Sequence, residues 1–351
     1  MLFPNADVVV NPLLLALLGL IVGTLTGFFA AGGFLITTGL LVFGVPPLFA
    51  VGTGLAMIMG SQLINTLKHR QMGNVDFRLG VLMLMGTIPG LVLAERVNST
   101  LEAAGLAGPV IGYMYTALLS AVGIFTLYDY WRTRHRSGGR SDEVTTARLA
   151  RRLQTLRFPP SSIKIPWMGN ASTHVPLPVS KIEDISVIVP VTIGFAVSFF
   201  AGLLGAGSGF ILLPLLIFVL GVPTTVAVGT GMFQIFVTSS TGTVLYALSN
   251  RVDLVMVVVM LVASSFGAQL GAAATRFVNP TRIRVLYTIT LLGSGVAIAL
   301  RQVSETASGV EFLSTTASVL LLSVSGAICL VIVVLLIVAV RRRPAMQRVQ
   351  S

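Results

Sequence analysis

Long apolar segments, separated by short polar or basic ones, recur along most of the chain. Two of them, Leu254 to Ala274 and Val319 to Val340, contain no charged side chain. About 20 consecutive apolar residues cross the hydrocarbon core of a bilayer as an α-helix. The predominantly apolar runs are Leu13 to Val42, Leu48 to Leu67, Phe77 to Ala94, Val110 to Tyr130, Val187 to Leu204, Phe210 to Leu220, Thr224 to Leu248, Leu254 to Ala274, Ile283 to Leu300 and Phe312 to Val340, the last of which contains Val319 to Val340. The pattern predicts an all-α, polytopic membrane protein.

Composition agrees with this pattern and excludes several classes of protein. Hydrophobic residues make up 54% of the chain and charged residues only 10%, whereas charged residues are about a quarter of a soluble domain. The net charge of +11 comes from basic loops, without the basic stripe interleaved with aromatics that a nucleic-acid groove needs. Cys329 is the single cysteine, so no internal disulfide or multi-thiolate metal site is expected. We expect neither a metal nor a cofactor.

The chain repeats itself at a fixed spacing. Gly-Val-Pro at 44–46 and Ala-Val-Gly-Thr-Gly at 50–54 recur at 221–223 and 227–231, a spacing of 221 − 44 = 177 residues. Val-Asp at 75–76 recurs at 252–253 with the same spacing. The predicted organisation is a first transmembrane repeat at 1–131, a basic, proline-containing linker at 132–185, a second transmembrane repeat at 186–301, and an extra transmembrane helix with a basic tail at 302–351.

The orientation of the repeats follows from the positive charges. Each repeat opens with an apolar run that glycines interrupt, and a hairpin at that break, whether re-entrant or fully crossing, makes the number of crossings per repeat odd. The loop at 68–78, the linker and Arg341 to Arg343 then share one side, which the positive-inside rule makes cytoplasmic. We therefore expect inverted repeats in the cytoplasmic (inner) membrane, with the N-terminus outside and the linker and C-terminus inside. Such repeats are typical of secondary transporters.

Two features outside the repeats receive simple interpretations. The linker holds ten lysines and arginines against four acids; a cytoplasmic connection with a short surface helix near 144–156 is predicted, with contact to anionic membrane lipid as the alternative. Trp131 and the tyrosines near the ends of the run at 110–130 are typical of interfacial anchors. These tyrosines are Tyr113, Tyr115, Tyr128 and Tyr130.

The glycine breaks are the first candidate binding elements. A break inside an apolar run exposes backbone N–H groups, which can hold an anion together with helix N-termini. Irregular backbone at membrane depth is tolerated only where it is buried or lines a cavity. Close helix packing is the alternative use of glycine in membranes. The residues concerned are Gly32 and Gly33 in the first break, and Gly205, Gly207, Ser208 and Gly209 in the second.

Polar side chains inside the apolar runs are the second candidate elements. Thr53 and Thr230 occupy equivalent positions in the repeats, where each hydroxyl can serve a ligand or bond to a carbonyl of its own helix. Amides are costly in lipid unless paired, so Gln62, Asn65, Gln234 and Thr238 are expected to face the interior, for substrate or for another helix. The predicted binding set is Gly32, Gly33, Thr53, Gln62, Asn65, Gly205, Gly207, Ser208, Gly209, Thr230, Gln234 and Thr238.

Catalytic chemistry is not expected. The turn around Ser208 resembles that of a serine nucleophile, but the histidines, His69, His135 and His174, lie in loops or the linker, where none can act as its general base. No acid or base lies deep in an apolar run. Asp76 and Asp253 stand at equivalent helix starts, where an N-cap explains both. No catalytic residue is assigned, and the protein is not expected to be an enzyme.

The order and duplication of these short motifs resembles a known family. A glycine-rich break, a Gly-Val-Pro turn, an Ala-Val-Gly-Thr segment and a Val-Asp helix start, repeated around a hydrophilic linker, are similar to the sulfite and organosulfonate exporters of TauE/SafE type. The likeness is clearest from Gly202 to Phe210, with Ser208 inside a cluster that is commonly all glycine. The first half departs from the pattern, with Ala30-Ala31 before its glycines and Thr37 where the second has Pro214.

The resemblance implies movement of a small sulfur-containing anion such as sulfite or sulfoacetate. We therefore expect a secondary transporter, an exporter by this resemblance, with a midplane site at the two breaks and with a proton or sodium ion as a possible coupling partner. The alternatives are a transporter of a small carboxylate or other inorganic anion, and, from another class, a membrane enzyme or a sensor. Import or export, the coupling ion and the oligomeric state stay open at this point.

Overall fold

The computed structural model describes residues 2–3, 6, 8–29, 32–71, 73–135, 162–165, 169–172, 174–207, 209–275, 280–306 and 311–347. Ser208, Ala30-Ala31 and the predicted surface helix at 144–156 lie outside these residues. The described chain is almost entirely helical, and six of its helices are long and apolar enough to cross a membrane. The expected class, an all-α polytopic membrane protein, is therefore confirmed.

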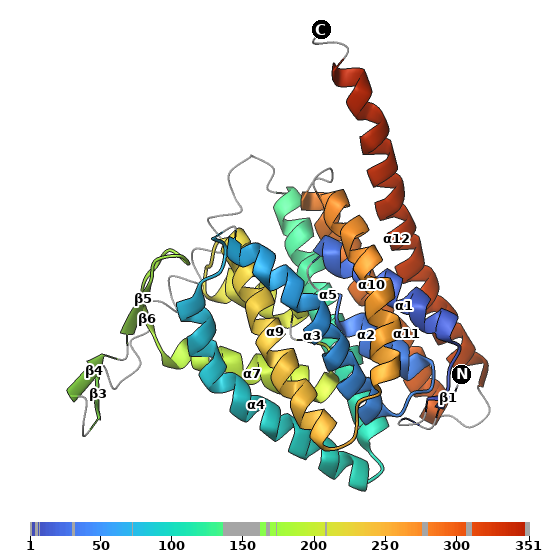
Figure 1. Ribbon diagram of the computed structural model, residues 1–351, viewed down its shortest axis with the longest axis horizontal. Coiled ribbons are helices and arrows are strands. Elements are labelled where there is room, and N and C mark those ends of the chain that lie inside the picture. The colour runs from blue at the N-terminus through green and yellow to red at the C-terminus, as the bar shows by residue number, and fades with distance from the viewer. Residues whose placement is uncertain are drawn as a thin grey trace.

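The helices follow the predicted apolar runs. Those of the first half are α1 (Pro12–Phe29), α2 (Phe34–Val42), α3 (Pro47–Gln71), α4 (Phe77–Ala103) and α5 (Ala107–His135). Those of the second half are α7 (Ile188–Leu204), α8 (Gly209–Pro214), the π-helical η1 (Leu215–Val219), α9 (Thr224–Leu248), α10 (Leu254–Thr275) and α11 (Pro280–Thr306). The long α12 (Glu311–Gln347) follows and extends beyond the other helices at its C-terminal end (Figure 1).

Three small antiparallel hairpins, which the sequence analysis did not predict, lie before α1 and within the linker. Their strands are β1 (Leu2–Phe3) with β2 (Val8–Val9), β3 (Ser162–Ile165) with β4 (Gly169–Ser172), and β5 (His174–Leu177) with β6 (Ile182–Ser186). The apolar strand residues Leu177, Ile182 and Ile185 are buried. The β5–β6 hairpin is thus packed rather than hanging free in the linker.

Glycines in the left-handed conformation end the helices before each turn. Gly205 ends α7 with φ = +67°, and Gly44 and Gly221, which follow α2 and η1, have φ = +84° and +71°. Only glycine adopts these angles without strain. A Val-Pro pair follows both Gly44 and Gly221. The repeated Gly-Val-Pro motif is therefore a helix stop followed by a new helix start.

The two halves of the chain pack closely, because helices of one half lie against helices of the other. The most extensive contacts join α1 to α10 and α4 to α7, while α3 packs along α9 at the centre of the molecule (Figure 1). A Cβ added to Gly19 would lie 2.4 Å from the carbonyl oxygen of Met260, and one added to Gly194 would lie 2.1 Å from that of Met83. Small residues let membrane helices approach to backbone contact. Glycine is required at these crossings.

One face of α10 carries a stripe of exposed apolar side chains. Residues spaced by four positions along it are largely exposed although they are large and apolar, whereas Met256 and Met260 on the opposite face are fully buried. An exposed stripe at helical spacing on so apolar a helix suits contact with acyl chains rather than water. The stripe consists of Leu254, Val258, Val262, Phe266 and Leu270.

Candidate functional site

Two equivalent hydrogen bonds join the halves where α4 and α10 begin. The backbone N–H of Asp253 donates to Thr53 Oγ1 at 3.1 Å, and that of Asp76 donates to Thr230 Oγ1 at 2.9 Å. Both threonines are fully buried. Their hydroxyl oxygens accept from the opposite half of the chain instead of serving their own helices. The two threonines therefore connect the halves to each other.

The two aspartates cap their helices as predicted, but their second oxygens differ. Asp76 Oδ1 accepts from the N–H of Leu79 at 3.1 Å, and Asp253 Oδ1 accepts from two N–H groups in the first turn of α10. Asp76 Oδ2 also accepts the N–H and O–H of Ser180, at 3.1 and 2.6 Å, in the turn between β5 and β6. Asp253 Oδ2 is buried and has no partner within the described chain. The linker thus completes one cap and not the other.

The two glycine breaks meet inside the molecule. A Cβ added to Gly33 would lie 2.6 Å from the carbonyl oxygen of Ala206, and one added to Gly205 would lie 2.5 Å from Cα of Val51. Thr37, on α2, donates its hydroxyl to the carbonyl of Gly205 at 2.8 Å. The breaks are therefore in direct contact, and close packing alone requires glycine at these two positions.

The remaining glycines of the predicted set also have close neighbours. A Cβ at Gly32 would lie 2.3 Å from Thr26 Oγ1, and one at Gly207 would lie 2.8 Å from Ile58 Cδ1. Gly209 is buried at the start of α8. Whether any of these positions also contacts substrate stays a prediction.

The C-terminal end of α7, at the second break, has an unusual set of hydrogen bonds. The last carbonyls of a helix lack partners within the helix, and an unsatisfied carbonyl in a membrane costs several kcal/mol. Here four successive carbonyls each accept from a buried side chain of a different helix, α9, α4, α5 and α2. The pairs are Tyr246 Oη with Gly202 O at 3.0 Å, Asn98 Nδ2 with Leu203 O at 3.1 Å, Tyr115 Oη with Leu204 O at 2.6 Å, and Thr37 Oγ1 with Gly205 O at 2.8 Å.

This arrangement changes the interpretation of the break and of one tyrosine. On its α7 side the break presents carbonyls with donors in place, and the N–H groups expected for an anion belong to the other side, where α2 begins after Gly33. Tyr115 is fully buried, so its prediction as an interfacial anchor is wrong. Tyr113 and Tyr128, by contrast, are 55% and 63% exposed.

A second group of polar side chains lies between α4, α7 and α9. Gln234 Nε2 donates to Thr87 Oγ1 at 2.5 Å, and Ser198 Oγ donates to the same oxygen at 3.1 Å. Ser198 Oγ lies 3.4 Å from Thr238 Oγ1, and Thr87 donates to the carbonyl of Met83. We call Thr87, Ser198, Gln234 and Thr238 the polar cluster; all four are fully buried. The structure thus brings together the predicted residues Gln234 and Thr238.

The polar cluster has hydrogen-bonding capacity to spare. Gln234 Oε1 and the neighbouring Ser239 Oγ are buried and have no partner within the residues that the structure describes. Rotation of the Gln234 amide by half a turn exchanges its oxygen and its NH₂ group, so this position can offer an acceptor or two donors. A buried polar group without a partner is costly. Its presence beside the second break marks the cluster as the candidate binding site.

The other predicted amides form a separate pair. Asn65 Nδ2 donates to Gln62 Oε1 at 3.4 Å, both on α3.

Thr87 and Ser198 were missed by the sequence analysis. The signal that identified Gln234, a polar side chain inside an apolar run, applies to both, since each lies in the middle of one.

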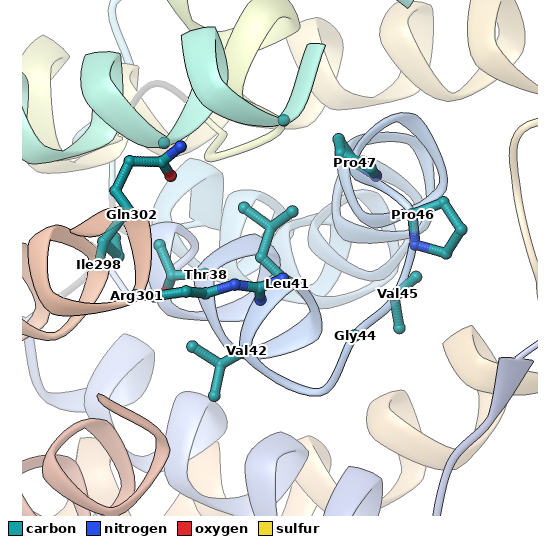
Figure 2. A pocket seen from close by; sticks show the side chains of 12 residues that line it. Thr38, Leu41, Val42, Gly44, Val45, Pro46, Pro47, Ile298, Arg301 and Gln302 are labelled. Atoms are coloured by element: carbon teal, nitrogen blue, oxygen red, sulfur yellow. The ribbon is translucent and has the colours of Figure 1, made fainter. Parts of the chain in front are cut away.

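A cavity of about 190 Å³ lies at the other end of α2 (Figure 2). Three of its lining side chains are polar: Thr38 on α2, and Arg301 and Gln302 on α11. The sequence analysis did not select them, because Arg301 directly follows the apolar run that was expected to end at Leu300. The other lining residues are Leu41, Val42, Gly44, Val45, Pro46, Pro47, Gly108, Gly112 and Ile298.

The fold is that of a polytopic helical membrane protein with a buried polar cluster. The model of the family described as Sulfite exporter TauE/SafE matches residues 15–298. The chain belongs to this family, as its sequence motifs suggested.

Curated relatives agree with this assignment. The chain is 26% identical over 288 residues to the probable membrane transporter protein YunE of Bacillus subtilis, a match that covers 80% of this chain and 94% of the relative. It is 24% identical to YjnA of the same organism, over 80% of this chain and 97% of the relative. A probable membrane transporter protein of Xylella fastidiosa is 24% identical, over 74% and 83%. No solved structure gives a significant match. Family and relatives favour transport over catalysis.

Proposed function

We propose that the protein is a secondary transporter, an exporter, that moves sulfite or a small organosulfonate such as sulfoacetate across the cytoplasmic membrane. The observation that carries the proposal is the polar cluster, four fully buried side chains with unused hydrogen-bonding capacity between α4, α7 and α9. The family description supplies the sulfur anion.

Neutral donors suit this task because a transport site must release what it binds. Hydroxyl and amide groups can hold the oxygens of a sulfite or sulfonate group, and unlike a buried lysine or arginine they leave no uncompensated charge in the empty state. The start of α2 lies at the contact between the breaks and adds a favourable helix end, although the N–H groups of Leu35 and Ile36 already donate to the carbonyls of Gly32 and Gly33. The anion would lie between the polar cluster and this helix end.

Transport requires a movement that opens the site to alternate sides. The packing of α1 on α10 and of α4 on α7, each pair with one helix from each half, supports such a movement. We propose that 1–131 and 186–301 are inverted repeats, related by an axis between α3 and α9, with the linker and C-terminus cytoplasmic. The pairs α1/α10 and α4/α7 exchange under such an axis, as do the hydrogen bonds of Thr53 and Thr230. A proton or sodium ion would drive the cycle. Rocking of one pair against the other would open the site to alternate sides.

Flux into proteoliposomes tests the proposal. We expect purified protein to transport sulfite and sulfoacetate, and Gln234→Leu to reduce the rate at least tenfold without loss of folded protein. Ser240→Ala is the matched control, because Ser240 lies on the same helix but bonds only to its own helix at Phe236 O. Transport of carboxylates with no response to sulfur anions would refute the sulfur assignment. Unchanged flux in Gln234→Leu would refute the site.

A further inference from the structure

We propose that the cavity between α2, α5 and α11 is a second anion site, which holds a small oxyanion such as a sulfite, sulfate or sulfonate group through Arg301. It is separate from the polar cluster. The inference rests on the proposed function only for what the anion does after it has bound.

Charge and size favour such a ligand. Arg301 is the one charged residue among the twelve that line the cavity, and its guanidinium carries five donors. It can therefore bind an oxyanion in addition to a protein partner. The planar fork matches two oxygens of a sulfonate or sulfate group. A volume of about 190 Å³ admits a group of this size and excludes a large organic anion.

Two uncharged polar side chains, Thr38 and Gln302, line the cavity together with Arg301. Gln302, which neighbours Arg301 on α11, is 4% exposed, and Thr38 is fully buried on α2. Figure 2 shows the side chain of Arg301 running from α11 toward Thr38 and Leu41. The Thr38 hydroxyl donates to the carbonyl of Phe34 at 2.9 Å, so the donors for an oxyanion come from the Arg301 guanidinium.

Two helix starts add to the positive potential. Pro47 and Gly108 line the cavity and stand at the N-terminal ends of α3 and α5, which are 25 and 29 residues long. The C-terminal end of α2 opposes them there, but α2 has only nine residues. N-terminal helix ends attract anions through their partial positive charge, although Pro46, Pro47 and Pro109 have no N–H to donate at these two starts. These ends are independent of Arg301, and both favour an anion.

Helix α2 connects this cavity to the meeting of the breaks. Thr37 donates to Gly205 at the break, while the next residue, Thr38, lines the cavity. Successive residues point about 100° apart around a helix, and nine residues extend for roughly 13 Å. An anion in the cavity is thus one short helix away from the interior. We infer that the cavity is a waiting position on the transport route.

Binding of sulfate and sulfoacetate to full-length protein in nanodiscs, followed by calorimetry, tests this site. Because the polar cluster is itself proposed to bind sulfoacetate, the cavity variants are compared in a Gln234→Leu background. We expect Arg301→Gln to weaken binding at least tenfold and Arg301→Lys to weaken it less. Gly108→Leu should block the cavity while keeping Arg301, since a Cβ at Gly108 meets only Pro47 Cγ, at an ordinary 3.5 Å. Arg96→Gln, which removes an exposed charge outside the cavity, should leave binding unchanged.

The outcomes separate this inference from the proposed function. The second site would be overturned if the unchanged protein does not bind these anions. It would also be overturned if Arg301→Gln and Gly108→Leu bind them as tightly as the unchanged protein, even if flux is measured. A purely structural Arg301 would give lower stability with unchanged affinity, which would also overturn it. Binding that depends on Arg301, in a protein without flux, would instead support the cavity and refute the transporter. Gln234→Leu should keep this binding and lose flux.

Discussion

The helix pairs α1/α10 and α4/α7 are equivalent in packing and different in chemistry. In both, glycines press against carbonyls of the partner helix, as Gly23 does on Ser264 and Gly194 on Met83. Gly19 packs on Met260 and Gly194 on Met83, so these two glycines are equivalent by packing at a spacing of 194 − 19 = 175 residues, two fewer than for the later motifs.

The same spacing of 175 relates Gly23 to Ser198. In the α1/α10 pair this position is Gly23, which contacts the backbone of Ser264. In the α4/α7 pair it is Ser198, a member of the polar cluster. The α1/α10 interface is therefore closely packed, whereas the α4/α7 interface carries a polar site.

The largest effect is expected from filling the packed interface. A Cβ at Gly23 would lie 2.2 Å from the carbonyl oxygen of Ser264, and backbone cannot move aside as a side chain can. Gly23→Val should therefore destabilise the protein by about 3 kcal/mol or more, visible as loss of monodisperse protein and a lower Tm. Gly326→Val is the control, because a Cβ there meets nothing within 4 Å. Equal stability of the two variants would contradict the packing.

An intermediate effect is expected from making the second interface like the first. Ser198→Gly gives α7 the residue that α1 has, and removes the link between Thr87 and Thr238. We expect flux to fall between tenfold and a hundredfold, with a smaller change in Tm than for Gly23→Val. Proteoliposome flux and thermal unfolding of the same samples measure both. A variant that loses stability in proportion to flux would indicate that Ser198 only packs.

The smallest effect concerns the two helix caps. Asp76 accepts two more hydrogen bonds than its N-cap bond, both from Ser180, whereas Asp253 Oδ2 accepts none from described residues. Asp76→Asn should therefore cost about 1 kcal/mol more than Asp253→Asn, because it disturbs a buried charge-assisted pair. Chemical unfolding compares the two. The difference should shrink in a Ser180→Ala background, which removes the hydroxyl donor and keeps the backbone N–H, and an unchanged difference there would contradict the role of the Ser180 hydroxyl.

Much of the fold was predictable because lipid restricts what a chain can do. Apolar runs of sufficient length must be helices, and the Gly-Val-Pro and Val-Asp motifs mark their stops and starts with local chemistry that needs no partner. The hairpins were not predictable from this pattern, because their strands are short and two of the three lie in the polar linker. Tyr115 was misassigned for a related reason: its position near a helix end says nothing of which neighbour lies above it.

The site was predictable only in part. Gln234 stood out because an amide inside an apolar run requires a partner, but its actual partners, Thr87 and Ser198, come from helices distant in sequence. Asn98 and Tyr246, which satisfy carbonyls at the end of α7, depend likewise on helices meeting in space. Arg301 was not predicted as a binding residue, because the cavity that it lines forms only when α2 and α5 pack against α11.

The sequence by itself determined the membrane class, the repeated motifs, the positions of the main apolar helices and the family, because each follows from hydropathy, turn chemistry and order along one chain. Only the tertiary structure decided which of two equivalent residues has all its polar atoms hydrogen-bonded and which does not. Equivalent residues become different when their neighbours differ, as with Ser180 beside Asp76 and Ser198 in the place of Gly23. In a medium without water, those neighbours determine whether a polar group is a structural contact or a site.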